Sequence, residues 1–221
     1  FDTAPVGLVT DTLQIGQHAE AYDVFMSLTT TPLRNAEIFF SAAKCQAMMR
    51  DTTAMLSLLD SCVSTFSKPY LKEAAPYLWQ RAEARREAGK YRDVVSDMNE
   101  YEKLMAASIN DNFYYIRHQT DIHARLYQQA LNDISEAIRI NPKETLYYAE
   151  KASLEVRVGL FDDAEVTARE CIAIEPENSD GYLFLGLAQC MKDNKTEGLA
   201  NLRKAKELGD PQADSLIEKY Q

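Results

Sequence analysis

The residues of this sequence that could perform acid–base chemistry or bind a metal ion are few and far apart. Three histidines occur, His18, His118 and His123. On one helix, His118 and His123 would point about 140° away from each other, so they could not bind a metal ion together. The adjacent carboxylates Asp162 and Asp163 fit the start of a helix, where capping explains them. We therefore interpret the histidines as structural or solvated, and expect no metal site.

The cysteines and the known catalytic motifs lead to the same interpretation. Neither CxxC pairs nor zinc-site spacings occur among the four cysteines, which are Cys45, Cys62, Cys171 and Cys190. We expect free, buried cysteines that pack as small apolar side chains, with disulfides as the alternative. The GxSxG, HExxH, P-loop and Rossmann fingerprints do not occur in the sequence. The sequence therefore predicts a protein that is not an enzyme and needs no cofactor.

Composition and charge narrow the class of protein. Of the 221 residues, 46% are hydrophobic and 26% charged, and only 8 glycines and 7 prolines interrupt the chain, which favours a helical globular protein. A net charge of −10 without a basic cluster argues against nucleic-acid binding. No apolar run of about 18 residues occurs, so we expect a soluble protein without membrane insertion. The start at Phe1 fits a removed signal peptide and a trimmed sequence equally, so cytoplasmic and exported locations both stay open.

A repeat of 34 residues organises the chain. The segments ALNDISEAIRINP and AEVTARECIAIEP end at Pro142 and Pro176, 34 residues apart, and Ala130 and Ala164 share that offset. This pattern resembles the tetratricopeptide repeat family, which has small residues at positions 8, 20 and 27 of each repeat and large apolar residues at positions 4 and 24. Numbered from the first residue of each repeat, the units cover approximately residues 2–35, 36–69, 75–108, 111–144, 145–178 and 179–212.

Small residues at fixed intervals let two antiparallel helices approach closely, and neighbouring hairpins then stack because one hairpin cannot bury its apolar face alone. We therefore predict an all-α fold of about six helix–turn–helix units in a single domain, residues 1–221. The resemblance alone implies that the units form a right-handed α–α superhelix, or solenoid. Beyond Leu208, the residues Gly209, Asp210 and Pro211 predict a capping helix over about 211–220.

Charged residues depart from the repeat pattern in the central units. Position 7 holds Arg81 and Arg117, and position 23 holds Asp97 and Asp133. Since these positions lie on facing helices of one hairpin, we expect the ion pairs Arg81–Asp97 and Arg117–Asp133. The repeat 111–144 matches least well, because His118 replaces the small residue at position 8. Its first helix could therefore be shifted by one residue.

The family resemblance also implies where a ligand would bind. First helices of successive repeats line a concave groove in this family, and position 5, one of those facing it, reads here Val6, Phe40, Trp79, Tyr115, Ala149 and Leu183. The implied groove residues are Phe40, Lys44, Trp79, Glu83, Arg86, Tyr115, Gln119 and Arg157. Exposed aromatics are typical of peptide-binding hot spots. The alternative is that Phe40, Trp79 and Tyr115 pack against neighbouring helices.

The predicted function is a non-catalytic scaffold or adaptor that binds a peptide or helix of a partner protein in this groove. Two alternatives stay open: a self-associating structural element, hence a possible homo-oligomer, and a regulatory or sensing arm of a longer protein. The lysine and asparagine residues with which some family members bind a C-terminal carboxylate are missing at positions 5 and 9. The identity of the partner does not follow from the sequence.

Overall fold

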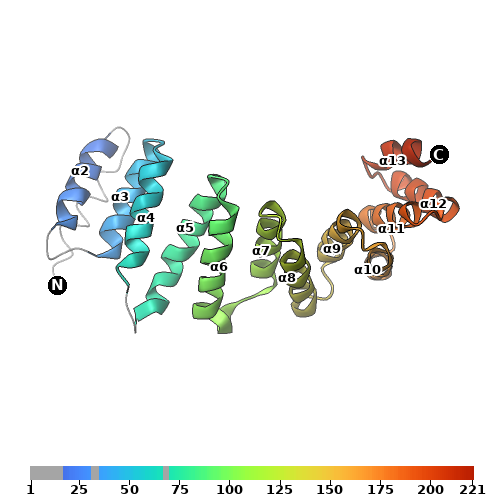
Figure 1. The fold of residues 1–221 in the computed structure, drawn as a ribbon, viewed down its shortest axis with the longest axis horizontal. Helices are drawn as coiled ribbons and strands as arrows, with labels where there is room; N and C mark the ends of the chain where they lie inside the picture. The colour runs from blue at the N-terminus through green and yellow to red at the C-terminus, as the bar shows by residue number, and fades with distance from the viewer. Residues whose placement is uncertain (1–16, 31–34, 67–69) are drawn as a thin grey trace. The chain divides into compact units, whose positions relative to one another are not determined.

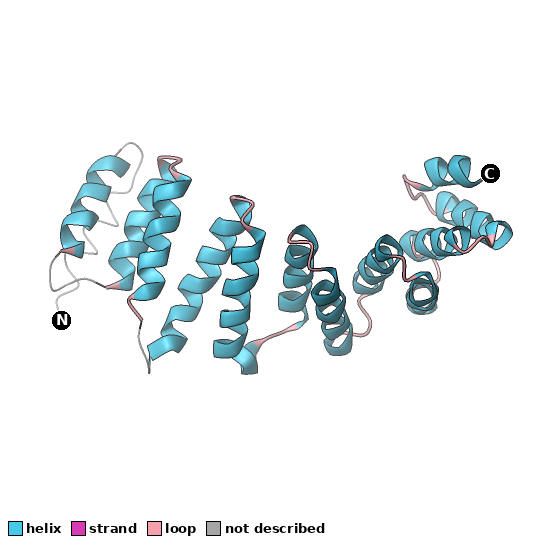
Figure 2. Ribbon diagram, in the orientation of Figure 1, coloured by secondary structure: helices cyan, strands magenta, loops and turns pink. Residues whose placement is uncertain are grey.

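The structure is a computed structural model that describes residues 17–30, 35–66 and 70–221. These residues form α-helices with two short 3₁₀ helices, and Figure 2 shows no strand among them. Contacts within the chain divide it into two compact units, Phe1–Ile109 and Asn110–Gln221, here called the first and the second unit. The all-α, tetratricopeptide-type fold is confirmed, whereas the organisation as one domain stays a prediction.

In the first unit, consecutive helices lie side by side in chain order (Figure 1). The helices α3 and α4 form one hairpin, and α5 and α6 form the next, with α2 packed on α3. The elements are α2 (His18–Thr29), α3 (Ala36–Met48), α4 (Thr52–Ser64), the 3₁₀ helix η1 (Tyr70–Ala74), α5 (Ala75–Glu87), α6 (Tyr91–Met105) and the 3₁₀ helix η2 (Ala106–Ser108).

The second unit contains three further hairpins and a last helix packed against the third of them. Its elements are α7 (Asp111–His123), α8 (Tyr127–Ile140), α9 (Thr145–Val158), α10 (Phe161–Ile174), α11 (Ser179–Met191), α12 (Lys195–Glu207) and α13 (Ala213–Tyr220). Helix α7 begins at position 1 of its repeat, as α3 and α11 do. The one-residue shift considered for this helix is therefore not found.

An asparagine directly before the first helix of a repeat starts three of these hairpins. The side-chain oxygens of Asn35, Asn110 and Asn178 accept hydrogen bonds from backbone N–H groups three residues later, at 3.0, 3.0 and 2.9 Å. Each bond satisfies a donor that the first turn of a helix leaves unpaired, which stabilises the helix by about 1 kcal/mol. The repeat period thus fixes where these helices begin.

Small residues hold the two helices of a hairpin together. Ala152 at position 8 and Ala164 at position 20 are fully buried. In the last hairpin, glycines occupy both positions, and a Cβ atom added to Gly186 would lie 2.7 Å from the carbonyl oxygen of Gly198. No real Cβ tolerates that distance, so the backbones of α11 and α12 touch only because both side chains are missing.

The helices α2 and α13 are the first and the last that the structure describes, and both were predicted from the sequence. Of the repeat 2–35 only the second helix, α2, is described, and its Ala21 and Phe25 are buried as the pattern predicts. At the other end, the Asp210 carboxylate accepts hydrogen bonds from the backbone N–H groups of Gln212 and Ala213, at 2.7 and 3.1 Å. Because this turn includes residues 211 and 212, the capping helix α13 begins two residues later than predicted.

Candidate functional site: an aromatic pocket in the first unit

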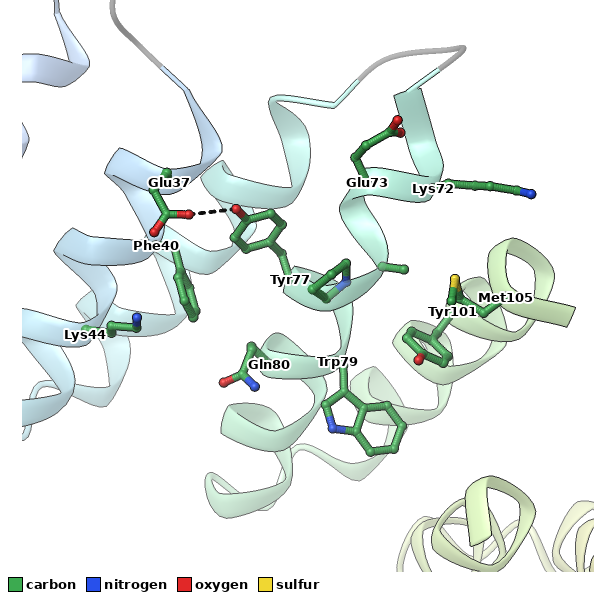
Figure 3. Close-up of a pocket in the computed structure, with 12 residues that line it drawn as sticks. Glu37, Phe40, Lys44, Lys72, Glu73, Tyr77, Trp79, Gln80, Tyr101 and Met105 are labelled. Carbon is green, nitrogen blue, oxygen red and sulfur yellow. Dashed lines mark hydrogen bonds between the residues drawn. The ribbon is translucent and has the colours of Figure 1, made fainter. Parts of the chain in front are cut away.

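A pocket of about 940 Å³ lies in the first unit, between α3, η1, α5 and α6 (Figure 3). Aromatic side chains from three helices line it, and the two lysines and two glutamates in the lining balance each other in charge. These residues are Phe40, Tyr77, Trp79 and Tyr101, and Glu37, Lys44, Lys72 and Glu73. A concave, mainly aromatic site with a few polar groups is typical of ligand-binding pockets.

On the α3 side of the pocket, Phe40 and Tyr77 pack edge to face, with ring centroids 5.3 Å apart. The Tyr77 hydroxyl donates a hydrogen bond of 2.9 Å to Oε2 of Glu37. Burial is the main cause that raises the pKa of Tyr77 to about 12, and this hydrogen bond is the second. The hydroxyl therefore stays a neutral donor at physiological pH. The ammonium group of Lys44 lies 4.3 Å from the centroid of the Phe40 ring, which is a cation–π contact.

On the α6 side of the pocket, Trp79 packs against Tyr101, with ring centroids 5.3 Å apart (Figure 3). Tyr101 stands at position 27 of its repeat, where the other repeats from residue 36 onward carry the fully buried residues Cys62, Ala137, Cys171 and Ala205. A tyrosine cannot be enclosed at such a close-packed position. Its ring is instead half-buried, and it extends the aromatic surface that Trp79 begins.

A network of ion pairs fixes the helix that presents Tyr77 and Trp79. Nη2 of Arg81 and Nη1 of Arg85, both on α5, lie 2.6 and 2.7 Å from Oδ1 of Asp97 on α6. The same two guanidinium groups also contact Asp60 on α4, at 3.1 and 2.8 Å. The predicted Arg81–Asp97 pair is therefore confirmed, and Arg85 joins it. Since Asp97 is 1% exposed, this buried network sets the register of α5 on α6.

In the second unit, the predicted groove residues Tyr115 and Gln119 form a cluster of their own. The Tyr115 ring packs on Tyr147 at 5.3 Å, and its hydroxyl accepts a hydrogen bond of 2.9 Å from Nε2 of Gln119. The hydroxyl also donates to Oε1 of Glu150, at 3.5 Å. Burial and then the negative charge of Glu150 raise the pKa of Tyr115. Tyr115 thus matches the packing alternative more closely than an exposed aromatic.

The structure brings three of the predicted groove residues together: Phe40, Lys44 and Trp79 line the pocket. Two others on α5 do not line it, the half-buried Glu83 and the exposed Arg86. Arg157, on α9, lies against the Tyr127 ring of the second unit, with its guanidinium carbon 5.2 Å from the centroid.

Position 5 does not have one role along the chain. Ala149 and Leu183, at 4% and 1% exposure, are core residues, so the expectation of a groove-facing position 5 is wrong there. Val6 lies outside the described residues. Participation of the remaining groove residues in binding stays a prediction.

Nine of the twelve residues that line the pocket were not among the groove residues predicted from the sequence, and these include Tyr77, Gln80 and Tyr101. Tyr77 and Gln80 stand at positions 3 and 6 of their repeat, where no groove residue was predicted. One signal was present, because Tyr101 occupies a position where the pattern predicts a small residue. A large aromatic there has to reach a surface instead of the core.

A buried polar cluster joins α7 to α8 and accounts for the irregular repeat. Arg117 donates two hydrogen bonds of 2.7 Å to the Asp133 carboxylate, so the second predicted ion pair is confirmed as a bidentate one. Nδ1 of His118 lies 2.9 Å from the carbonyl oxygen of Ala130, to which it donates. Burial lowers the pKa of His118, so the imidazole is neutral.

Asp121, one turn along α7, is 1% exposed in the same cluster. The pKa of Asp121 is raised to about 7, mainly by burial and secondly by the negative charge of the neighbouring Asp133 carboxylate. His118 is itself fully buried, so the cluster positions two helices instead of facing a substrate.

The cysteines, the metal-binding side chains and the length and polarity of the helices bear on other kinds of site. The four cysteines are all buried and are not joined in disulfides, as expected for residues that fill the core. Within residues 17–30, 35–66 and 70–221, no three metal-binding side chains gather in one place. The helices of these ranges are also too short or too polar to cross a membrane.

Known proteins give a consistent picture of the family. No family model matches the chain. The small glutamine-rich tetratricopeptide repeat-containing protein 2 of Saccharomyces cerevisiae is 29% identical over 96 residues, which cover 43% of this chain and 28% of that protein. The Hsp70-Hsp90 organizing protein of Triticum aestivum is 25% identical over 150 residues, 65% of this chain and 24% of that protein. The chain thus spans about a quarter of the length of the curated relatives it matches.

Solved structures agree with these relatives. YrrB, described as a TPR protein with an unusual peptide-binding site, superposes with a TM-score of 0.65 at 14% identity, over 90% of this chain and all of that one. A MamA protein superposes with a TM-score of 0.62 at 18% identity, over 81% of this chain and 94% of that one. Because the sequences are only 14% and 18% identical, these superpositions show a similar fold and nothing about function. The repeat period, the paired helices and these similar proteins together show that the chain has the fold of tetratricopeptide-repeat proteins.

Proposed function

We propose that this chain is a non-catalytic protein-interaction module, and that the pocket of the first unit binds a segment of a partner protein. The observation that carries the proposal is the gathering of four aromatic rings around one pocket of about 940 Å³. Rigid aromatic side chains provide a large contact area at a low cost in conformational entropy, so they dominate binding energy at protein interfaces.

The frame of the pocket supports the same function. Its aromatic residues stand on α3, α5 and α6, and the Asp97 network fixes α5 against α6. A pocket that is formed before its ligand arrives loses little freedom on binding, which favours affinity. Two similar proteins point the same way, since YrrB is described as having a peptide-binding site and the wheat relative is named an organizing protein for Hsp70 and Hsp90.

Ligand binding to the pocket can be measured by the fluorescence of Trp79, because Trp79 is the single tryptophan of the chain. A panel of tryptophan-free peptides that covers extended, helical, acidic and proline-rich sequences can be titrated into the intact chain while the Trp79 emission is recorded. We expect at least one class to change the emission saturably. If no peptide changes it, or if it changes with protein concentration alone because a second copy fills the pocket, the proposal is contradicted.

Substitutions locate the binding site. Trp79→Ala and Phe40→Ala should each weaken binding of a labelled peptide about tenfold or more, as expected when a hot-spot residue worth about 1.4 kcal/mol or more is truncated. Tyr220→Ala is the matched control, since this half-buried tyrosine lies on α13, with its hydroxyl 3.0 Å from the sulfur of Met191. It should leave affinity unchanged. Equal losses in all three variants would place binding elsewhere.

A further inference from the structure

We infer that the ligand of the pocket is a proline-rich segment in the polyproline II conformation, an inference that rests on the proposed function and specifies its ligand. The recurring ways in which proteins bind peptides differ in what they require of the receptor. The residues that line this pocket therefore indicate which kind of peptide it can bind.

The described part of the chain does not offer what three of these binding modes require. Strand addition needs an open sheet edge, and the described residues contain no strand. Recognition of a phosphorylated or acidic motif needs a cluster of arginines, and the lining contains none. A helix would need one continuous hydrophobic groove for anchors spaced three, four and seven residues apart, whereas the aromatic rings of this pocket form two separate pairs.

The aromatic surface is the feature that a proline-rich ligand requires. Such segments dock into aromatic-lined grooves, where flat rings face the pyrrolidine rings of a helix that is already ordered before binding. The pocket offers two separate aromatic pairs, Phe40 with Tyr77 and Trp79 with Tyr101, both at 5.3 Å between centroids. Figure 3 shows the first pair on the α3 side and the second on the α6 side, so a ligand that crosses the pocket would meet both.

Hydrogen-bonding capacity and charge agree with this choice. A proline-rich backbone has carbonyl acceptors but few N–H donors, so it needs donors from its receptor. The lining offers exposed donors in the Lys44 ammonium and the Gln80 amide, and one carboxylate oxygen of Glu37 is engaged by the Tyr77 hydroxyl. Because Lys44 and Lys72 are balanced by Glu37 and Glu73, the lining favours an uncharged segment over a charged one.

The direct probe is N-acetyl octaproline amide, which contains no chromophore that overlaps with tryptophan. Titrated into the intact chain, it should change the Trp79 emission saturably and bind about tenfold or more tightly than a glycine–serine octapeptide, because only the former is already ordered. Affinity should change by less than about twofold between about 50 and about 500 mM salt, since an uncharged ligand has no ion pairs to screen.

Three variants test the proposed contacts while keeping the fold. Tyr101→Leu keeps an apolar side chain but removes the ring, and should weaken octaproline about fivefold, whereas Tyr101→Phe should bind within about twofold of the original chain. Gln80→Glu replaces an exposed donor by an acceptor and should weaken binding about threefold. Glu87→Ala, at the exposed end of the same helix and outside the lining, is the control and should bind normally.

The outcomes separate this inference from the proposed function. A saturable response to octaproline that Tyr101→Leu weakens supports both. A response to a helical or acidic peptide but not to octaproline overturns the inference and leaves the proposed function intact. Equal binding by Tyr101→Leu and Tyr101→Phe also overturns it, because the ring would then be irrelevant. If no peptide in the panel produces a response, both are contradicted.

Discussion

Tyr101 packs its ring 5.3 Å from that of Trp79, although it stands at the position where Cys62, Ala137, Cys171 and Ala205 are fully buried in their own repeats. In those repeats the position serves close packing between helices. In repeat 75–108 it serves a surface, because the aromatic ring extends the wall of the pocket. One substitution in a repeat pattern thus turns a packing position into part of a candidate binding site.

The contact between these two rings should be visible in the protein without any ligand. Tyr101→Ala removes the partner that shields one side of the indole, so we expect the Trp79 emission to shift to longer wavelength as water reaches the ring. Tyr127→Ala, in the second unit, should leave the emission unchanged. An unaltered spectrum in Tyr101→Ala would contradict the packing described for this pair.

The Asp97 network predicts a large difference between buried and exposed ion pairs. Asp97→Ala leaves the Arg81 and Arg85 guanidinium groups without their buried partner and should lower the free energy of unfolding by about 3–5 kcal/mol. Glu136→Ala breaks the solvent-exposed pair with Arg139, where water screens the charges, and should lower the free energy of unfolding far less. Urea unfolding measures both, and similar losses would show that the buried network does not hold α5 on α6.

The raised pKa of Asp121 predicts how stability depends on pH. Its pKa is about 7 in the folded chain and ordinarily 3.8, so the folded state binds the proton more tightly than the unfolded state. The stabilisation that the folded chain gains by binding this proton is fully present below the ordinary pKa of 3.8. It is lost as the pH rises towards and through 7. Asp121→Asn should therefore lose stability less steeply than the original chain between pH 5 and pH 7.5.

His118 acts in the opposite direction, because burial lowers its pKa and protonation therefore favours unfolding at acid pH. Both chains contain His118, so the difference between their urea midpoints at the two pH values isolates Asp121. If the original chain and Asp121→Asn show the same change between pH 5 and pH 7.5, Asp121 does not carry the shifted proton.

The glycine pair of the last hairpin predicts a steric cost. In Gly186→Ala the added Cβ would meet the Gly198 carbonyl oxygen at 2.7 Å and the Leu202 nitrogen at 2.9 Å, and backbone atoms cannot turn aside. We expect a loss of about 1–3 kcal/mol in the free energy of unfolding. Gly181→Ala is the comparison, since its one contact under 3 Å is a side-chain atom, Cγ1 of Ile172 at 2.9 Å, and not a backbone atom. Equal stability of the two variants would contradict the close approach.

The sequence predicts the helices and their pairing well because the physics behind them is local and repeated. Asn35, Asn110 and Asn178 recur before the first helix of a repeat and begin it through the same hydrogen bond. The pairs Arg81–Asp97 and Arg117–Asp133 follow from two positions that face each other within one hairpin. Such features depend on residues in a single repeat, which is why spacing alone reveals them.

The candidate site is less predictable, because it depends on what neighbouring helices place beside each residue. Trp79 and Tyr115 share position 5, yet Trp79 lines a pocket whereas Tyr115 is covered by Tyr147 and held by Gln119. The difference arises from partners that the family pattern does not specify. Tyr101 departs visibly from the pattern, but its place in the pocket depends on the neighbouring Trp79 ring.

Binding in the pocket of the first unit requires that the ligand contact the indole of Trp79. Because the chain has one tryptophan, a nitrogen-15 correlation spectrum contains one indole N–H signal, and it belongs to the pocket. On titration with a peptide whose binding is established by calorimetry, we predict that this signal moves progressively to a saturating value. A peptide that binds in the calorimeter while the indole signal stays in place would show that the pocket is not the binding site.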